Sequence, residues 1–266
     1  MDWYKGKRRI ADAIHLDLTH HQERYAAELR RAVKPGIRWL DVGCGHNIVP
    51  DWAMRAEEQE QLVRRAKFLV GVDVDDGIVR HPRLTYRVKA LGGELPFKND
   101  TFDLVTANMV VEHVNDPEGF LSDIFRVLRP GGHFLFVTPN CLTPMLLAGR
   151  IFPDAIKKRV VRFLEHREFQ DIFPTCYRMN QPRTIESYAN KTGFEVEQLK
   201  LIGSNGEFNY MGPVSWIECF FLKAMQDSFH GQLQPDILAV LARGKVCRTR
   251  GVSAERHQTR SVIATG

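Results

Sequence analysis

The sequence predicts an α/β fold in which helices cover both faces of a mostly parallel sheet. Short apolar runs of strand length alternate with longer segments whose apolar residues recur at helical spacing, and Pro and Gly residues separate the two kinds of segment. With 266 residues, 44% of them hydrophobic and 26% charged, the chain has the length and composition of a globular protein with its own core.

Seven apolar runs are predicted to be strands, because each is short, rich in β-branched or aromatic residues and bounded by turn residues. In chain order they are 37–42, 68–73, 84–89, 103–108, 133–138, 195–202 and 237–242.

Helices are predicted between these strands from their apolar periodicity and their boundary residues. Residues 6–33 are expected to form one long amphipathic helix that ends at Pro35-Gly36. The other predicted helices are 52–66, a helix from Asp116-Pro117 to Arg129-Pro130-Gly131-Gly132, and helices at 154–165 and 182–192.

The apolar stretch 216–225 is expected to be a helix that buries its apolar face on the domain. A peripheral membrane contact through 216–225 is the alternative. No run of 18 or more apolar residues is present, so no transmembrane segment is expected.

The positive charge is concentrated near the C-terminus. The formal charge is +5, yet residues 243–266 hold six Lys/Arg and one Glu, and the other 242 residues carry 31 basic and 31 acidic groups. We therefore expect no nucleic-acid partner, and we predict that the basic tail 245–266 is disordered. The five scattered cysteines suggest neither disulfides nor a metal site, and the N-terminus lacks a signal peptide, so a cytoplasmic location is expected.

The motif WLDVGCGHN at 39–47 describes a strand that turns sharply through two glycines. Dinucleotide sites, phosphate-binding loops and S-adenosylmethionine sites all begin in this way. A dinucleotide fingerprint would have a third glycine where Ile48 stands and an acid about 20 residues further on, whereas Asp73 comes 28 residues after Gly45. The phosphate-binding loop would need a Lys-Ser/Thr pair, which is missing.

The motifs that follow resemble those of the class I S-adenosylmethionine-dependent methyltransferases, specifically the group often called type 11. The resemblance covers about residues 36–140 and consists of LDVGCGHN, VGVDVD, LPFKNDTFDLVTANMVVEHVNDP and IFRVLRPGGHFLFVTPN, in this order. It implies a Rossmann-like, doubly wound, seven-stranded sheet whose last strand is antiparallel, with helical cap insertions. It also implies one domain, 1–244, in which 1–33 form an N-terminal helical cap and 139–182 and 203–236 are variable substrate-cap segments.

The resemblance implies a role in cofactor binding for several residues. Asp41 would help to hold the methionine ammonium group, and the backbone of Gly43, Cys44 and Gly45 would approach the methionine moiety. Asp73 would accept hydrogen bonds from both ribose hydroxyls. The residues expected near the adenine or the transferred methyl group are Val74, Gly92, Gly93, Glu94 and Asn108.

Two positions depart from the family pattern. Asn47 replaces a third loop glycine, which is tolerable because Asn accepts a positive φ angle better than other non-glycine residues. Leu91 stands where relatives usually place an aspartate that binds the adenine amino group. Glu94 or a backbone group would then take over that contact, or adenine is held more loosely.

The expected activity is transfer of a methyl group from S-adenosylmethionine to a small-molecule acceptor, with O-methylation favoured. His113 is a candidate general base, although it could instead only cap a helix or brace a loop, and His166 and Tyr177 are further catalytic candidates from the variable region. A methyltransferase that acts on protein or nucleic acid, and a catalytically inactive cofactor-binding scaffold, are the alternatives. The acceptor and the oligomeric state do not follow from the sequence.

Overall fold

The sheet has seven strands in the order β3-β2-β1-β4-β5-β7-β6. Neighbouring strands pair in parallel, except that β7 is antiparallel to both β5 and β6. The Rossmann-like, seven-stranded sheet with an antiparallel last strand is therefore confirmed. The structure is a computed structural model that describes residues 2–91, 93–144, 174–203, 213–228 and 232–245.

All seven predicted runs form strands. β5 begins earlier than predicted, because Leu128 already pairs with Phe102 ahead of the Pro-Gly-Gly turn. The strands are β1 (Arg38–Val42), β2 (Phe68–Asp73), β3 (Tyr86–Lys89), β4 (Phe102–Asn108), β5 (Leu128–Pro139), β6 (Phe194–Ile202) and β7 (Asp236–Arg243).

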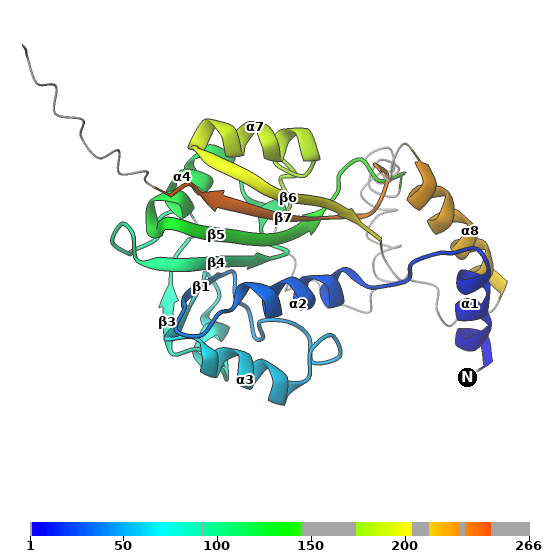
Figure 1. Cartoon of the computed structure of the whole chain (residues 1–266), viewed down its shortest axis with the longest axis horizontal. Coiled ribbons are helices and arrows are strands. Elements are labelled where there is room, and N and C mark those ends of the chain that lie inside the picture. The colour runs from blue at the N-terminus through cyan, green and yellow to red at the C-terminus, as the bar shows by residue number, and fades with distance from the viewer. Residues whose placement is uncertain (1, 92, 145–173, 204–212, 229–231, 246–266) are drawn as a thin grey trace, which may run out of the picture.

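Helices cover both faces of the sheet (Figure 1). α4 and α7 pack on one face, where Ile124 and Ile185 are buried, and α2 and α3 lie on the other, where Tyr25 and Leu29 are buried. Burial of each such side chain favours folding by about 1.5–3 kcal/mol. The helices are α1 (Asp2–Ala13), α2 (His21–Ala32), α3 (Ala56–Arg65), α4 (Pro117–Val127), α7 (Pro182–Thr192) and α8 (Pro213–Asp227), with the 3₁₀ turns η1 (Asp76–Arg80) and η2 (Val111–His113).

The single helix predicted over 6–33 is wrong, because this segment forms the two helices α1 and α2. His15 adopts a left-handed backbone conformation with a φ of 53°, and His20 is the N-cap of α2. The His20 ring accepts a hydrogen bond from the backbone N–H of Gln22 (3.1 Å), and Glu23 accepts one from the N–H of His20 (3.0 Å). These reciprocal bonds satisfy backbone donors at the start of α2 and fix its first turn.

The apolar periodicity continues through this break because the two helices pack against different partners. Ile10 and Ile14 pack with Cys219 and Leu222 of α8, whereas the apolar face of α2 packs on the sheet. Periodicity alone does not distinguish one long helix from two helices that share a phase.

The apolar stretch 216–225 forms part of α8, but its apolar face is not buried as predicted. Ile217, Phe220 and Phe221 are 70%, 60% and 48% exposed. The opposite face of α8 packs against α1, where Glu218 forms a buried ion pair with Lys7 at 2.8 Å. Among the described residues no helix is long and apolar enough to cross a bilayer, and the peripheral membrane contact stays a prediction.

Two predicted segments lie outside the described residues. They are the helix at 154–165, within the variable segment 139–182, and nearly all of the basic tail 245–266. The division of 1–244 into a domain with cap segments stays a prediction.

Arg243 ends the last strand and belongs to the folded domain rather than to the basic tail. Its guanidinium group donates hydrogen bonds to the carbonyl groups of Phe125 (2.8 Å) and Leu128, and it forms an ion pair with Asp100 at 2.7 Å. The group also lies 4.7 Å from the centre of the Phe125 ring. It therefore ties β7 to the end of α4.

Replacement of Arg243 by Ala should lower the free energy of unfolding by about 1–3 kcal/mol, because several carbonyl groups lose a charged donor. Urea unfolding followed by circular dichroism measures the effect. Deletion of 246–266 is the control and should leave the unfolding midpoint unchanged, because the sheet is complete at Arg243. A deletion that destabilises the protein as much as Arg243→Ala would show that the tail belongs to the fold.

Candidate active site

The carboxyl ends of the parallel strands gather the predicted site residues at one edge of the sheet. Asp41 lies near the end of β1, Asp73 ends β2 and Asn108 ends β4. Because these three strands are neighbours in the sheet, the loops that follow them lie side by side. In open α/β sheets this edge is where ligands bind.

The glycine loop after β1 turns back on β2. The backbone N–H groups of Gly43 and Cys44 donate to the carbonyl oxygen of Val72, at 2.7 and 3.3 Å. Gly43 and Gly45 both have positive φ angles, 64° and 48°. A Cβ atom at Gly43 would lie 2.3 Å from Val110, whereas a Cβ atom at Gly45 would meet no atom within 4 Å. The first glycine is therefore required by packing, and the second leaves open space beside the loop.

Asp73 joins this loop to the end of β2. Its Oδ2 accepts a hydrogen bond from the N–H of Gly45 (2.8 Å), and its Oδ1 accepts one from the N–H of Asp75 (3.0 Å). The next residue, Val74, is 37% exposed. Asp73, the residue predicted to bind the ribose, thus contacts the loop predicted to bind the methionine moiety.

The carboxyl group of Asp41 is buried beneath the loop, and its Oδ1 accepts a hydrogen bond from Thr106 Oγ1 at 2.6 Å. Thr106 Oγ1 in turn accepts one from Trp39 Nε1 at 2.7 Å. Burial raises the pKa of Asp41 to about 7; the Thr106 hydrogen bond opposes this rise and the charge of Asp73 adds to it. Asp41 therefore gains a proton near neutral pH when no cation lies beside it.

The Cys44 side chain is not available for chemistry. It is 3% exposed and packs against Gly71 of β2, and burial raises the pKa of its thiol. Any contact of Cys44 with a ligand would therefore be made by its backbone.

The segment expected to hold adenine follows β3, the strand that pairs with β2. Gly93 and Glu94 are exposed there, and Leu91 is 60% exposed, while Gly92 lies outside the described residues. An exposed leucine thus stands at the position where relatives usually place an aspartate.

Asn108 contacts the first turn of α2. Its side-chain amide exchanges two hydrogen bonds with the amide of Gln22, at 2.8 and 2.9 Å. The adjacent His20 ring lies edge-on to Trp52, with ring centres 4.6 Å apart. Burial, reinforced by neighbouring His21, lowers the pKa of His20 to about 4. The first turn of α2 therefore lies over the end of β4 and carries a neutral His20.

Two of the three predicted catalytic residues lie around Glu112. His113 Nδ1 is 3.0 Å from the carbonyl oxygen of Pro174, and its Nε2 is 4.0 Å from Glu112 Oε1. Tyr177 donates its backbone N–H to the carbonyl oxygen of Glu112 at 3.0 Å. His166 lies outside the described residues.

Glu112 was not predicted as a site residue. Its side chain is buried and accepts a hydrogen bond from Thr138 Oγ1 at 3.1 Å, and Asn180 donates to the same hydroxyl at 2.7 Å. Burial raises the pKa of Glu112, with the charge of Asp236 acting in the same direction. The sequence signal was its position just after the fourth strand.

A second acid–base pair missed by the sequence analysis joins His21 and Asp236. His21 Nδ1 lies 3.1 Å from Asp236 Oδ2, and the two side chains are 16% and 8% exposed. Asp236 begins β7 opposite Pro139, so the pair lies at the same sheet edge as the end of β5. The run His-His-Gln at 20–22 was the available signal, but helical periodicity assigned His21 to an apolar face.

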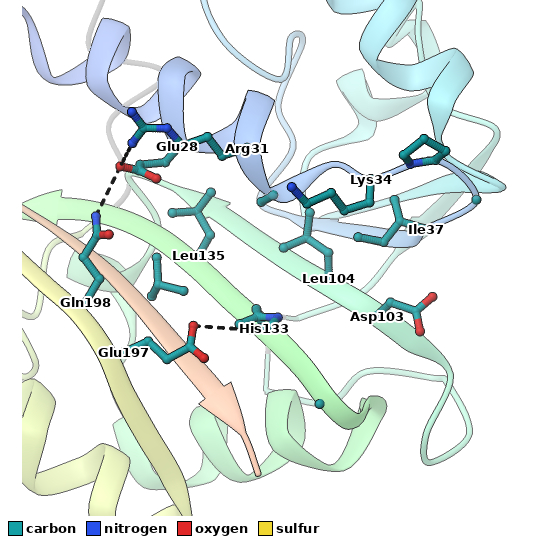
Figure 2. Close-up of a pocket in the computed structure, with 15 residues that line it drawn as sticks. Glu28, Arg31, Lys34, Ile37, Asp103, Leu104, His133, Leu135, Glu197 and Gln198 are labelled. Carbon is teal, nitrogen blue, oxygen red and sulfur yellow. Dashed lines mark hydrogen bonds and ion pairs between the residues drawn. The ribbon is translucent and has the colours of Figure 1, made fainter. Parts of the chain in front are cut away.

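A cavity lies at the opposite, amino edge of the sheet (Figure 2). It has a volume of about 650 Å³ and lies between the C-terminal half of α2 and the strands. Leu104 and Leu135 line its apolar part, and His133 and Glu197 form an ion pair at 3.2 Å on its wall. Because this cavity faces away from the glycine loop, it is not the candidate active site.

Comparison with known proteins identifies the family of the chain. A family model for a methyltransferase domain matches residues 18–199. A protein of Mycolicibacterium smegmatis named as an S-adenosylmethionine-dependent methyltransferase is 38% identical over 108 residues, which cover 39% of this chain and 38% of that protein. The human mitochondrial ubiquinone biosynthesis O-methyltransferase is 30% identical over 174 residues, which cover 61% of this chain and 42% of that protein. The chain thus spans about two fifths of the length of these relatives.

Solved structures show the same fold. A methyltransferase from Haloferax volcanii, in complex with the Trm112 methyltransferase activator, superposes with a TM-score of 0.53 at 16% identity and covers 91% of this chain and 96% of its own. An S-adenosylmethionine-dependent methyltransferase from Mesorhizobium loti gives 0.52 at 17% identity, covering 82% and 96%.

The chain belongs to the methyltransferase-domain family. The matched domain, residues 18–199, is of the class I S-adenosylmethionine-dependent methyltransferase type. The edge described above fits this cofactor: open space beside Gly45 admits a ligand next to the loop, and a buried acid at Asp41 can receive the charge of an ammonium group.

The contribution of Asp41 to the free energy of unfolding of the ligand-free protein should fall as the pH rises from about 4 to about 7. The folded state raises the pKa of Asp41 from 3.8 to about 7, so the folded state holds this proton more tightly than the unfolded state does. The stabilisation by Asp41 is complete below its pKa in the unfolded state. It is lost as the pH rises through its pKa in the folded state, to a total of about 4 kcal/mol at most. Asp41→Asn should remove this contribution, so the difference in the free energy of unfolding between the wild-type protein and the variant, measured by urea unfolding at several pH values, should change over this range.

Glu112→Gln provides the comparison for this measurement, because burial raises the pKa of Glu112 as well and its contribution has the same sign. Each variant should remove part of the slope. Parallel profiles for the wild-type protein and Asp41→Asn would show that folding does not raise the pKa of Asp41.

Proposed function

We propose that the protein transfers the methyl group of S-adenosylmethionine to a hydroxyl group of a small-molecule acceptor. The observation that carries this proposal is the gathering of acid–base side chains, His21, Glu112 and Asp236, at the sheet edge that holds the glycine loop. A hydroxyl acceptor must lose a proton as it is methylated, whereas many other acceptors need no base. The ubiquinone biosynthesis O-methyltransferases among the relatives support the same acceptor chemistry.

In the proposed cofactor site, the backbone of Gly43, Cys44 and Gly45 lies along the methionine moiety and Asp73 accepts hydrogen bonds from the ribose. Asp41 supplies the counter-charge for the ammonium group, and the backbone carbonyl of Asn108 accepts a hydrogen bond from it. When bound, S-adenosylmethionine supplies a methyl group on a positively charged sulfur, which is already reactive. The chain therefore has to align the acceptor, exclude water and remove one proton.

For adenine we propose an apolar contact. Val74 and Leu91 are exposed side chains that follow the neighbouring strands β2 and β3. A flat aromatic ring can lie against such groups, and Glu94 is available to its amino group. This arrangement would replace the aspartate that relatives usually have at the position of Leu91.

A small acceptor is favoured over a nucleic acid by the charge distribution. Outside 243–266 the chain carries 31 basic and 31 acidic groups, so its body has no net charge with which to attract phosphates. Four free cysteines among the described residues favour a reducing compartment, and we propose a cytoplasmic location. A protein or nucleic-acid acceptor and an inactive scaffold are the competing outcomes of the test.

The test measures release of S-adenosylhomocysteine by the purified protein with a panel of acceptors. The panel contains phenols, catechols and aliphatic alcohols, with amines, thiols, a protein extract and RNA for comparison. We expect turnover with hydroxyl acceptors and a product that mass spectrometry identifies as a methyl ether. Turnover only with protein or RNA would replace the proposal, and cofactor binding without any turnover would favour the scaffold.

Gly43 and Gly45 should respond differently to the same substitution. Gly43→Ala should lower the melting temperature of the ligand-free protein, because its Cβ would lie 2.3 Å from Val110. Gly45→Ala should cost only the strain of its positive φ angle, about 1–2 kcal/mol, yet weaken cofactor binding as measured by calorimetry. Unchanged affinity in a folded Gly45→Ala variant would remove this loop from the cofactor site.

A further inference from the structure

We infer that His21 is the general base that removes the proton of the acceptor hydroxyl, and that Asp236 is the residue that positions it. The inference rests on the proposed function and assigns the proton transfer to a histidine other than the predicted His113. Its basis is the geometry of the first turn of α2 at the carboxyl edge of the sheet.

The His21–Asp236 pair has the arrangement that a histidine base needs. His21 Nδ1 lies 3.1 Å from Asp236 Oδ2, an ion-pair distance, but it forms no hydrogen bond within the described part of the chain, so the ring has to rotate before an Nδ1–H points at the carboxylate. A proton on Nδ1 leaves Nε2 as the acceptor. Asp236 is itself fixed by the strand, because its backbone pairs with Pro139 on one side and Ile202 on the other.

The pair is connected directly to the cofactor edge. The residue after His21 is Gln22, whose amide is bonded twice to the amide of Asn108 at the end of β4. β4 is the neighbour of β1, which carries the glycine loop. His21 thus stands between the strand ends that hold the cofactor and Asp236 at the start of β7, which is where an acceptor has to meet the methyl group.

The other acid–base groups at this edge are less suited to the role. Both ring nitrogens of His113 face protein groups, the Pro174 carbonyl oxygen at 3.0 Å and Glu112 at 4.0 Å. Glu112 is buried, and Thr138 donates to it. His20 accepts a hydrogen bond from a backbone N–H of its own helix turn, and its low pKa makes it a poor base.

The reaction step balances with these groups alone. As the bond from the methyl carbon to the acceptor oxygen forms, the bond from that carbon to sulfur breaks, and the hydroxyl proton passes to His21 Nε2. The products are a methyl ether, S-adenosylhomocysteine and an imidazolium ion beside Asp236. The imidazolium then returns its proton to water, because Asp236 stabilises the charge without having to take the proton.

The test compares His21→Gln with the wild-type protein on two probes, catechol and 4-nitrocatechol, whose hydroxyl group is far more acidic. For catechol at neutral pH, kcat should fall about 100- to 10,000-fold. The loss should be much smaller for 4-nitrocatechol and should shrink for catechol as the pH rises, because an ionised acceptor needs no base. The dissociation constant for S-adenosylmethionine, measured by calorimetry, should stay unchanged.

The pH profile should also report this histidine. The charged and titratable groups that face it are Asp236 of β7, His20 of α2 and, through Asp236, Glu112 of η2. His20 is neutral over the working range. In the wild-type protein, kcat for catechol should therefore show a limb that rises with pH. Asp236→Asn should lower kcat for catechol and displace this limb, and His21→Gln should abolish it.

His133→Gln is the matched control. His133 also pairs with a carboxylate, Glu197 at 3.2 Å, but the pair lies at the opposite edge of the sheet (Figure 2). This variant should keep the wild-type rates and pH profile. A folded His21→Gln variant with an unchanged profile, or one slowed equally on both probes, would overturn the inference.

A failure of the proposed function gives a different result. If the wild-type protein turns over neither probe nor any other hydroxyl acceptor of the panel, O-methylation itself is excluded, and the role of His21 as base is excluded with it. If His113→Asn abolishes the pH limb while His21→Gln retains it, O-methylation stands and the base is His113.

Discussion

The parallel pairing of β1 with both β2 and β4 is the constraint on which the site depends. It brings three strand ends to one edge, so that the glycine loop, Asp73 and Asn108 become neighbours although long stretches of chain separate them. The hydrogen bond from Gly45 to Asp73 then closes the loop against the next strand. Without that pairing, these residues would not lie together at one edge of the sheet.

Burial of polar groups gives this edge its chemical character. Asp41 and Glu112 are carboxylic acids held in apolar surroundings, and each keeps a hydroxyl partner that satisfies part of its hydrogen-bonding capacity. Desolvation raises the pKa of both acids, that of Asp41 to about 7, so the carboxyl group of Asp41 is only partly ionised near neutral pH. A cationic cofactor can supply the missing counter-charge when it binds.

Much of the sheet could be predicted from the sequence, because each strand is a local apolar run and the Asp41–Gly45 motif sits where such a run ends. The division of 6–33 into two helices was not predictable from periodicity, since Ile14 and Tyr25 face different partners with the same phase. The exposed face of α8 was missed because apolarity is usually a sign of burial.

The pairing of His21 with Asp236 could not be found from the sequence for a different reason. It joins the first turn of α2 to the last strand, and only the position of β7 between β5 and β6 brings these two residues together. His113 looked more promising because it follows a motif strand directly, and such local reasoning favours residues that lie near motifs. Reasoning from local motifs does not reveal interactions that depend on the order of the strands in the sheet.

One consequence concerns the exchange of ligands. Gln22 is hydrogen-bonded to Asn108, and His21 is paired with Asp236. Gln22 and His21 belong to a single helical turn that follows the non-helical link between α1 and α2. Any tilt of α2 away from the strand ends would break both of these interactions together. While α2 is tilted away, His21 would be separated from Asp236. The proposed proton removal would therefore require α2 to lie against the strand ends.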